Sequence, residues 1–220
     1  DDSSFGKLIP GWSINVSQLA EPIRSHTRTL AMSKLLYYFG GLALPNSLIV
    51  MSDLKQTYKS ALAKHCCFTV NMISHNSTAT YVDFFPSHSI LGCKKQSPVI
   101  KEYMLYLERL VSRDYTDEIK FLGEVDRYLY EQCRNHRMAL VEGAVFGTED
   151  IDKKSVTIER LMGNTFIEFS PQTMAIYVPA PEILKRTRYE WFARLSQSQL
   201  RTCDNMIAKY LLIAQNQVNV

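Results

Sequence analysis

Cys133 and His136 are a pair of residues whose types and spacing suggest a nucleophile beside its base. Residues three apart on a helix are neighbours, and an imidazole can activate an adjacent thiol for attack. Both residues, however, fall on the same apolar stripe as Leu129 and Leu140. A nucleophile that faces the core has no access to substrate. We therefore interpret the two as core residues, and an enzyme with an unfamiliar site at this pair stays an alternative hypothesis.

Histidines and cysteines gather between residues 65 and 93, and their side chains are the usual ligands of zinc. The spacing contains no C-x2-C pair, and the adjacent Cys66 and Cys67 point to opposite faces if they lie on a strand. The chain also lacks the P-loop, dinucleotide-binding, nucleophile-elbow and H-E-x-x-H motifs. We expect neither a metal site nor a cofactor.

The segment KRTRYEWFARL, residues 185–195, combines four basic with three aromatic side chains. If it forms one helix, Trp191 and Phe192 share an apolar face that also includes Arg188. Arg186, Arg194 and the more distant Arg201 lie roughly opposite that face. Single-stranded nucleic acid requires rings and cations that point at the same ligand. The pattern therefore predicts rings turned inward and guanidinium groups turned to solvent, where they could bind RNA or an anionic lipid surface. The candidate anion-binding residues are Arg186, Arg194, Arg201, Lys94, Lys95, Lys153 and Lys154.

Tyrosine is abundant, with 12 residues in the chain. Its amphipathic ring is favoured at protein interfaces, where the ring is covered and the hydroxyl finds a partner. Several tyrosines fall at the edges of predicted helical stripes, where a second subunit could cover them. The candidate interface residues are Tyr103, Tyr106, Tyr128 and Tyr130.

The elements that must position these residues are strands grouped between helices, which predicts an α+β fold rather than a doubly wound parallel sheet. Alternating and β-branched runs predict a β-hairpin at about 66–85 and a three-stranded antiparallel meander at about 155–178. Apolar residues at steps of three and four predict helices over most of the remaining chain. The predicted helices span residues 17–39, 46–65, 99–112, 117–142, 182–196 and 199–215.

No linker or repeat divides the 220 residues, so we expect one globular domain with residues 1–16 as an extended N-terminal segment. The most apolar stretch, residues 30–50, is interrupted by Lys34, Pro45 and Asn46, and we expect no transmembrane span. Five scattered cysteines do not indicate a disulfide framework. The compartment stays open.

A net charge of +3 permits an anionic partner without indicating one. The leading hypothesis is a non-catalytic structural or assembly subunit that acts through protein–protein contacts or self-association, such as a viral, organellar or secretion-machine component. The alternative is an RNA- or anionic-lipid-binding protein that uses the basic face of residues 182–201.

Overall fold

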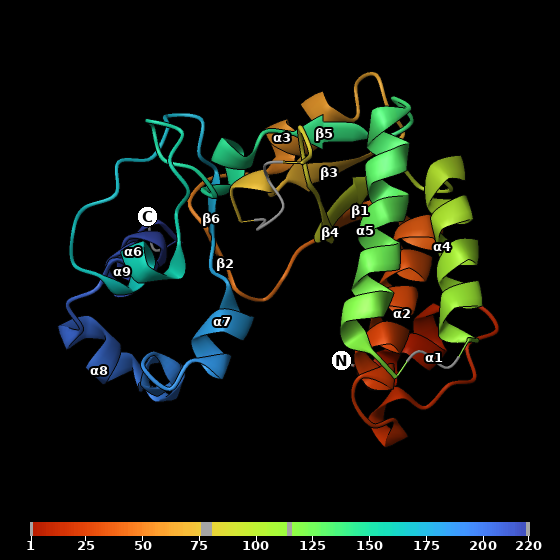
Figure 1. Ribbon diagram of the computed structural model, residues 1–220, viewed down its shortest axis with the longest axis horizontal. Coiled ribbons are helices and arrows are strands. Elements are labelled where there is room, and N and C mark those ends of the chain that lie inside the picture. Colours follow the sequence, from red (N-terminus) through yellow and green to blue (C-terminus); the bar gives the residue numbers. More distant parts are fainter. Residues whose placement is uncertain (1, 76–80, 114–115, 219–220) are drawn as a thin grey trace. The chain divides into compact units, whose positions relative to one another are not determined.

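The computed structural model describes residues 2–75, 81–113 and 116–218, with the backbone alone for 217–218. Over these residues the chain has an α+β fold with nine α-helices, one four-stranded sheet and one two-stranded sheet (Figure 1), which confirms the predicted class. The chain groups into two compact units. That it forms one globular domain stays a prediction. Unit 1 comprises Asp1–Leu44, Gln56–Asn71 and Phe85–Val141, and unit 2 comprises Pro45–Lys55, Met72–Phe84 and Glu142–Val220.

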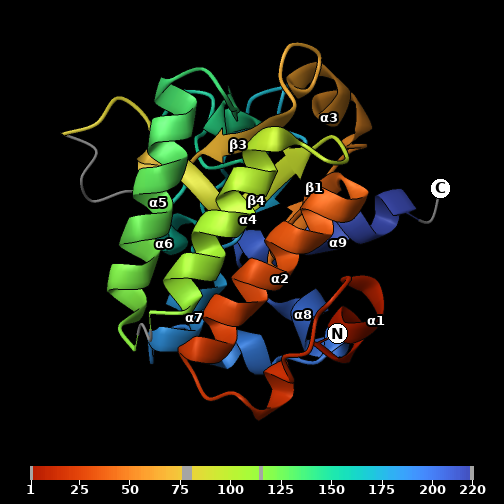
Figure 2. The same cartoon turned by 90° about the vertical axis from the view of Figure 1, so that its right-hand side faces the viewer.

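Three helices form the helical layer of unit 1, and two of them begin at caps that the sequence supplies. Ser97 accepts a hydrogen bond from the amide of Ile100 at 3.4 Å, with Pro98 in the first helical position. Asp117 accepts one from the amide of Ile119 at 3.0 Å. Figure 2 shows the three helices over one face of the sheet. They are α2 (Ile23–Phe39), α4 (Pro98–Val111) and α5 (Glu118–Arg134).

The four-stranded sheet of unit 1 has the order β1-β4-β3-β5, with β5 parallel to β3 and the other neighbours antiparallel. Phe68 lies directly opposite Gly92, and a Cβ at Gly92 would come within 2.1 Å of the Phe68 ring. The ring thus occupies the space that only glycine leaves free. The strands are β1 (Gly41–Ala43), β3 (Cys67–Asn71), β4 (Pro86–Cys93) and β5 (Ala139–Val141).

The partner of β3 comes later in the chain than the hairpin predicted at about 66–85. Strand β3 pairs with β4, which begins at Pro86, and residues 81–85 contain no strand. Residues 76–80, which include part of the predicted turn, lie outside the described residues. The close fit of Phe68 against Gly92 explains the later register, because the bulky run at 81–85 offers no glycine.

The N-terminal segment, expected to be extended over residues 1–16, instead contains two helical turns. Phe5, Ile9 and Val16 are buried together with Ala31 of α2. This packing stabilises helical turns that so short a segment would not form alone. Arg28 of α2 also forms an ion pair with Asp2 at 2.6 Å. The turns are η1 (Asp2–Ser4) and α1 (Phe5–Leu8), and η2 (Val16–Gln18) follows.

Unit 2 is built around a short antiparallel pair of strands, β2 (Leu48–Val50) and β6 (Ala175–Tyr177), in which Leu48 lies opposite Tyr177. The sequence predicts a helix over 46–65, but the structure has β2 in unit 2 and then the short helix α3 (Lys55–Ala61), which from Gln56 on belongs to unit 1. The buried core of unit 2 consists of Ile49, Val156, Ile158, Leu161, Ile167, Ile176, Val178, Ile183, Tyr189, Met206, Ile207 and Tyr210.

The three-stranded meander predicted at 155–178 does not form, and β6 is the one strand in that range, all of which is described. Helix α6 (Ile158–Met162) occupies the place of the first predicted strand. Ile158 and Leu161 are both buried, and a spacing of three places them on one face of a helix. A short apolar run of this kind is equally compatible with a strand. The periodicity of so short a segment cannot distinguish the two.

The C-terminal region is more broken than the two continuous helices predicted for 182–196 and 199–215. Ser196 and Gln199 form a capping box that starts a new helix, and Asn205 accepts a hydrogen bond from the amide of Ala208 at 2.8 Å to start another. The elements are α7 (Ala180–Lys185), η5 (Glu190–Arg194), α8 (Gln197–Thr202) and α9 (Met206–Val218). The 3-10 helices η3 (Ile73–His75) and η4 (Gly143–Phe146) complete unit 2.

Candidate functional site

The basic segment of unit 2 does not form the single helix on which its face assignment was based. Helix α7 ends at Lys185, and Arg186 adopts an extended conformation with φ −103° and ψ 111°. The following turn, η5, carries Trp191 and Phe192. Side chains before and after Arg186 therefore cannot be placed on one helical wheel.

The aromatic side chains of this segment divide between core and solvent. Tyr189 is buried in the core of unit 2, and Phe192 packs against that core while partly exposed. Trp191 is 46% exposed and Leu184 is 61% exposed. The indole N–H of Trp191 donates to the carbonyl of Arg188 at 2.9 Å, which fixes the ring beside the basic chain. The expected inward turn thus holds for Tyr189 and in part for Phe192, but not for Trp191.

The cations of the segment differ in how far their charge is neutralised. Arg186 pairs with both Glu159 and Glu182, and Arg194 lies 3.6 Å from Glu190. Three other exposed cations between residues 184 and 201 form no ion pair within 4.0 Å among the described residues. One of them, Arg188, has its guanidinium 5.5 Å from the centre of the Tyr189 ring. These three are Lys185, Arg188 and Arg201.

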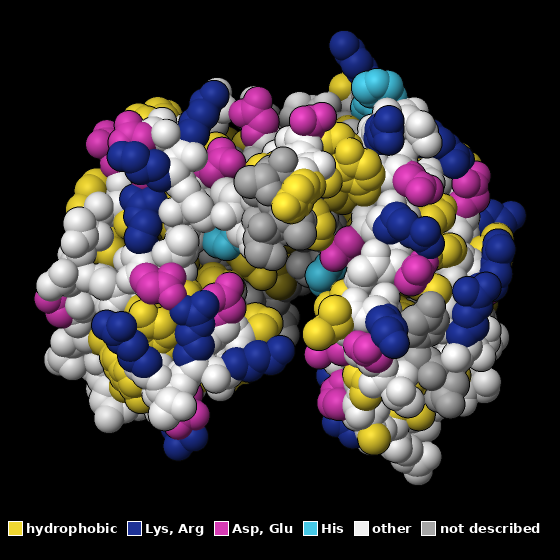
Figure 3. All heavy atoms as spheres, in the orientation of Figure 1, with side chains coloured by type: hydrophobic (Ala, Val, Ile, Leu, Met, Phe, Trp, Pro, Cys, Tyr) yellow, Lys and Arg dark blue, Asp and Glu magenta, His cyan; other side chains and the backbone are white. Residues whose placement is uncertain are grey.

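We call this region the 184–201 surface and define it by two exposed apolar side chains and four exposed cations. In Figure 3, hydrophobic side chains gather at the α7–α8 end of unit 2, with Lys and Arg side chains and a few Asp and Glu side chains around them. The surface can therefore present apolar groups and positive charge together. Its residues are Leu184, Lys185, Arg188, Trp191, Arg194 and Arg201.

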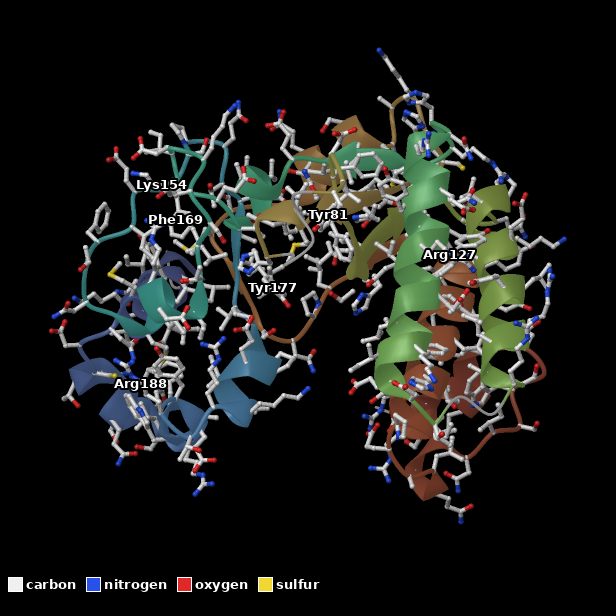
Figure 4. All side chains as sticks on the ribbon, in the orientation of Figure 1. Tyr81, Arg127, Lys154, Phe169, Tyr177 and Arg188 are labelled. Carbon is white, nitrogen blue, oxygen red and sulfur yellow. The ribbon has the colours of Figure 1, made fainter. Side chains whose placement is uncertain are left out.

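Of the lysines predicted to join this surface, Lys154 lies at another part of unit 2, and Lys94 and Lys95 belong to unit 1. Lys154 pairs with Asp152 at 3.2 Å, and Figure 4 shows Lys154 and Arg188 at opposite ends of unit 2. Lys153, next to it, has a positive φ of 63°. Lys94 and Lys95 are exposed in unit 1, in the turn after β4. The predicted anion-binding set therefore does not gather in one place within unit 2.

The candidate interface tyrosines pack largely within unit 1, between α4 and α5. Tyr103 is completely buried, so its ring is not part of the surface. The rings of Tyr106 and Tyr128 stack with centres 4.5 Å apart, and the Tyr106 hydroxyl donates to a carboxylate oxygen of Glu124 at 2.8 Å. Burial raises the pKa of Tyr128 to about 12. Tyr106, Tyr128 and Tyr130 are half-buried.

Cys133 and His136 do not form a thiol–imidazole pair on one helical face. Cys133 is buried in α5, and burial raises the pKa of its thiol to about 12, far from a reactive thiolate. His136 lies beyond the end of α5, exposed, with a φ of 55°. The His136 amide donates a hydrogen bond to the Cys133 carbonyl at 3.0 Å, and the Arg137 amide donates one to the Gln132 carbonyl at 3.0 Å. These are the two hydrogen bonds of a Schellman motif. His136 therefore terminates the helix rather than joining its core stripe.

The structure reveals a histidine–carboxylate pair that sequence reasoning missed. Nδ1 of His88 on β4 lies 3.1 Å from Oδ1 of Asp126 on α5. Such a carboxylate fixes the orientation of the ring. The two residues are 38 positions apart, and no local pattern links a strand residue to a helix residue at that distance. The pair connects the sheet of unit 1 to its helical layer.

A second histidine, His75, is enclosed within unit 2. Its ring meets the ring of Tyr177 edge-on with centres 5.9 Å apart; Tyr177 is labelled in Figure 4. Burial lowers the pKa of His75 below its ordinary 6.5, while Glu182 and the backbone of Thr148 act in the opposite direction. Burial thus favours the neutral imidazole, which packs against Tyr177 of β6.

The cysteines of residues 65–93 lie close together but without a metal-binding geometry. Cys67 and Cys93 are buried opposite each other on β3 and β4, and Cys66 accepts a hydrogen bond from the Ser97 hydroxyl at 3.2 Å. Within residues 2–75, 81–113 and 116–218, no three His, Cys, Asp or Glu side chains converge as a metal site. Over the same ranges, each helix is too short or too polar to cross a membrane.

Comparisons with protein-family models, with curated proteins and with solved structures gave no match.

Proposed function

We propose that the protein is a non-catalytic interaction subunit that associates with a second copy of itself or with a protein partner through an apolar surface of unit 1. The observation that carries this proposal is the exposure of large apolar side chains on α2 and on the N-terminal segment that packs against it. We call this set the N-terminal apolar surface. Its residues are Leu8, Ile14, Met32 and Phe39.

The spacing along α2 supports one continuous apolar strip. Met32, Leu35 and Phe39 are separated by three and four residues, which aligns them on one side of the helix. Leu35 packs against the cluster around Phe5, whereas Met32 and Phe39 are 39% and 57% exposed on either side of it. Covering such a side chain contributes roughly 1–2 kcal/mol.

The surface also has a firm support. The ion pair between Arg28 and Asp2 ties the N-terminal turn to α2, and the indole N–H of Trp12 donates to the carbonyl of Ile14 at 2.8 Å. The side chains are thus presented by packed elements, so little ordering entropy is lost when a partner covers them. A stable interface needs about 800 Å² from each partner, and these four side chains would form its centre.

The test is sedimentation velocity over a range of protein concentrations. We expect concentration-dependent association of the wild-type chain and a shift toward monomer in the double variant Met32→Gln/Phe39→Gln. Ile119→Gln is the matched control, because Ile119 is 83% exposed on α5 in the same unit but outside the surface. A wild-type chain that stays monomeric at every concentration and captures no protein from its native extract would contradict the proposal.

A further inference from the structure

The 184–201 surface of unit 2 concentrates positive charge in a way that the whole chain does not. Residues 184–201 contain five cations and a single carboxylate, Glu190, whereas the full chain has 25 Lys and Arg against 22 Asp and Glu. One of the five, Arg186, is paired with Glu159 and Glu182 and is not part of the surface. Glu190 lies 3.6 Å from Arg194 and weakens that charge alone. Lys185, Arg188 and Arg201 have no carboxylate within 4.0 Å among the described residues.

The apolar side chains of the same surface have no role in binding a purely polar anion. Leu184 is 61% exposed and Trp191 is 46% exposed. The neighbouring side chains Ile183 and Phe192 pack into the core of unit 2, which leaves Leu184 and Trp191 directed outward. An exposed aliphatic side chain, an exposed indole and several cations are the combination that a bilayer interface accommodates.

Single-stranded RNA fits these observations less well. Sequence-tolerant binding of a strand stacks successive bases on several exposed rings. Here Tyr189 is buried under the Arg188 guanidinium and Phe192 is partly covered by the core, so Trp191 is the one ring of the segment that is largely free. Leu184 would stay in water beside the strand.

We propose that the 184–201 surface binds an anionic lipid bilayer, with Leu184 and Trp191 entering the interfacial region and the cations contacting headgroup phosphates and carboxylates. The surface lies on the membrane and does not span it. A basic side chain close to an anionic membrane strengthens binding about fivefold, and this contribution decays within a Debye length. Binding should therefore be reversible, selective for anionic lipid and weakened by salt.

The probe is the full chain with large unilamellar vesicles, either phosphatidylcholine alone or phosphatidylcholine mixed with phosphatidylserine. The chain has two tryptophans, so Trp12→Phe leaves Trp191 as the sole indole reporter. We expect its emission to shift to shorter wavelength and its quenching by iodide to decrease with the mixed vesicles, and neither change with phosphatidylcholine alone. Added salt should reverse both changes.

Matched charge variants test whether the location of the cations matters. Arg188→Gln/Arg201→Gln and Lys153→Gln/Lys154→Gln remove the same charge from the same unit, and Figure 4 shows that Arg188 and Lys154 lie at its opposite ends. We expect the first double variant to lower the vesicle partition coefficient about 25-fold. The second should lower it about twofold or less, since the membrane field is screened at that distance.

Apolar variants separate insertion from simple charge attraction. Leu184→Ser and Trp191→Ser should each weaken partition about tenfold, because each removes an apolar side chain that enters the interface. Circular dichroism spectra and melting temperatures of every variant must match those of the wild type. We expect this match because Leu184 and Trp191 are exposed.

Three results would overturn the proposal. One is no partition into phosphatidylserine-containing vesicles at low salt. Another is equal loss in the two charge variants together with unchanged partition of Leu184→Ser. The last is tight binding of polyuridylate that the vesicles do not displace, which would assign the surface to RNA. None of these results bears on the N-terminal apolar surface, which is tested without lipid.

Discussion

Replacing Tyr103 by phenylalanine should stabilise the protein, because the Tyr103 hydroxyl is buried and has no hydrogen-bond partner among the described residues. The ring is completely buried in α4 and stacks on Tyr128 with centres 5.7 Å apart. A buried hydroxyl without a partner costs roughly 1–3 kcal/mol of folding free energy. The void left by one oxygen atom costs about 0.3 kcal/mol. Tyr103→Phe should therefore raise the free energy of unfolding by about 1 kcal/mol.

Two other tyrosines provide the same chemical change with the opposite expected sign. The Tyr106 hydroxyl donates to Glu124 at 2.8 Å, and the Tyr210 hydroxyl donates to the carbonyl of Ile167 at 2.7 Å. Tyr106→Phe and Tyr210→Phe each remove a formed hydrogen bond and should lower the free energy of unfolding by about 1 kcal/mol. All three variants delete a single oxygen, so the difference in sign isolates the effect of the partner.

Urea denaturation followed by near-ultraviolet circular dichroism measures the three variants under one set of conditions. With a urea m-value of about 1–3 kcal/mol/M, a change of 1 kcal/mol shifts the urea midpoint by about 0.3–1 M. The reasoning is refuted if Tyr103→Phe loses as much stability as Tyr210→Phe. That outcome would mean that the Tyr103 hydroxyl is satisfied in solution.

Three further predictions concern the end of a helix, an ion pair and the thiols. His136→Gly should stabilise the protein by about 0.5–1 kcal/mol in urea denaturation, because glycine adopts the left-handed conformation at the end of α5 without strain. The Arg160 ion pair and backbone hydrogen bonds outweigh burial and hold the pKa of Asp150 below its ordinary 3.8. The ionised Asp150 carboxylate therefore stabilises the folded state fully at pH values above its ordinary pKa of 3.8. This stabilisation is lost as the pH falls through the lowered pKa of the folded state. Denaturation series should show Asp150→Asn to be less stable than wild type by about 1–2 kcal/mol at pH 7, with the gap closing toward pH 2. Iodoacetamide mass mapping of the native protein should modify Cys66, which is partly exposed, well before the buried Cys133.

Each of these predictions has a control. His136→Ala should give no stabilisation, since alanine bears a Cβ in the left-handed region, and equal gains for both variants would exclude a backbone origin. Asp152→Asn changes an exposed neighbour and should leave the acid dependence unaltered. In urea Cys66 and Cys133 should react at similar rates; native Cys133 that reacts as fast as Cys66 would revive the hypothesis of a reactive thiol on α5.

The sequence predicts α4 and the start of α5 well, because both helices carry amphipathic patterns with caps at Ser97 and Asp117. The helix predicted over 117–142 is too long, since α5 ends at Arg134 and residues 139–141 form strand β5. The sequence fails on the strands. Strand β2 pairs with β6, which lies more than a hundred residues further along the chain, and no local preference specifies that partner. The run SVTIERL has β-branched residues, yet Ile158 and Leu161 bury equally well on one helical turn. Short apolar runs take the structure that their distant neighbours allow.

The candidate sites likewise combine features that are visible in the sequence with contacts that only the folded chain makes. The charge of residues 185–201 is visible in the sequence, but the outward position of Trp191 follows from the break at Arg186 that separates η5 from α7. The pairing of His88 with Asp126 requires the packing of β4 against α5 and has no signature in the sequence. Composition thus identifies a basic segment, whereas the three-dimensional fold decides which side chains share its surface.

The chain passes between the two units five times, since each is assembled from three separate segments. A fragment that begins at Glu142 would contain β6 and all of α6 to α9 but would lack β2 and the buried Ile49. Its β6 amides and carbonyls would lose their partners, and its core would open on one side. Deletion mapping, a common first step in locating a binding region, would destroy what it seeks in this chain. Point substitutions in the intact polypeptide are the appropriate tool.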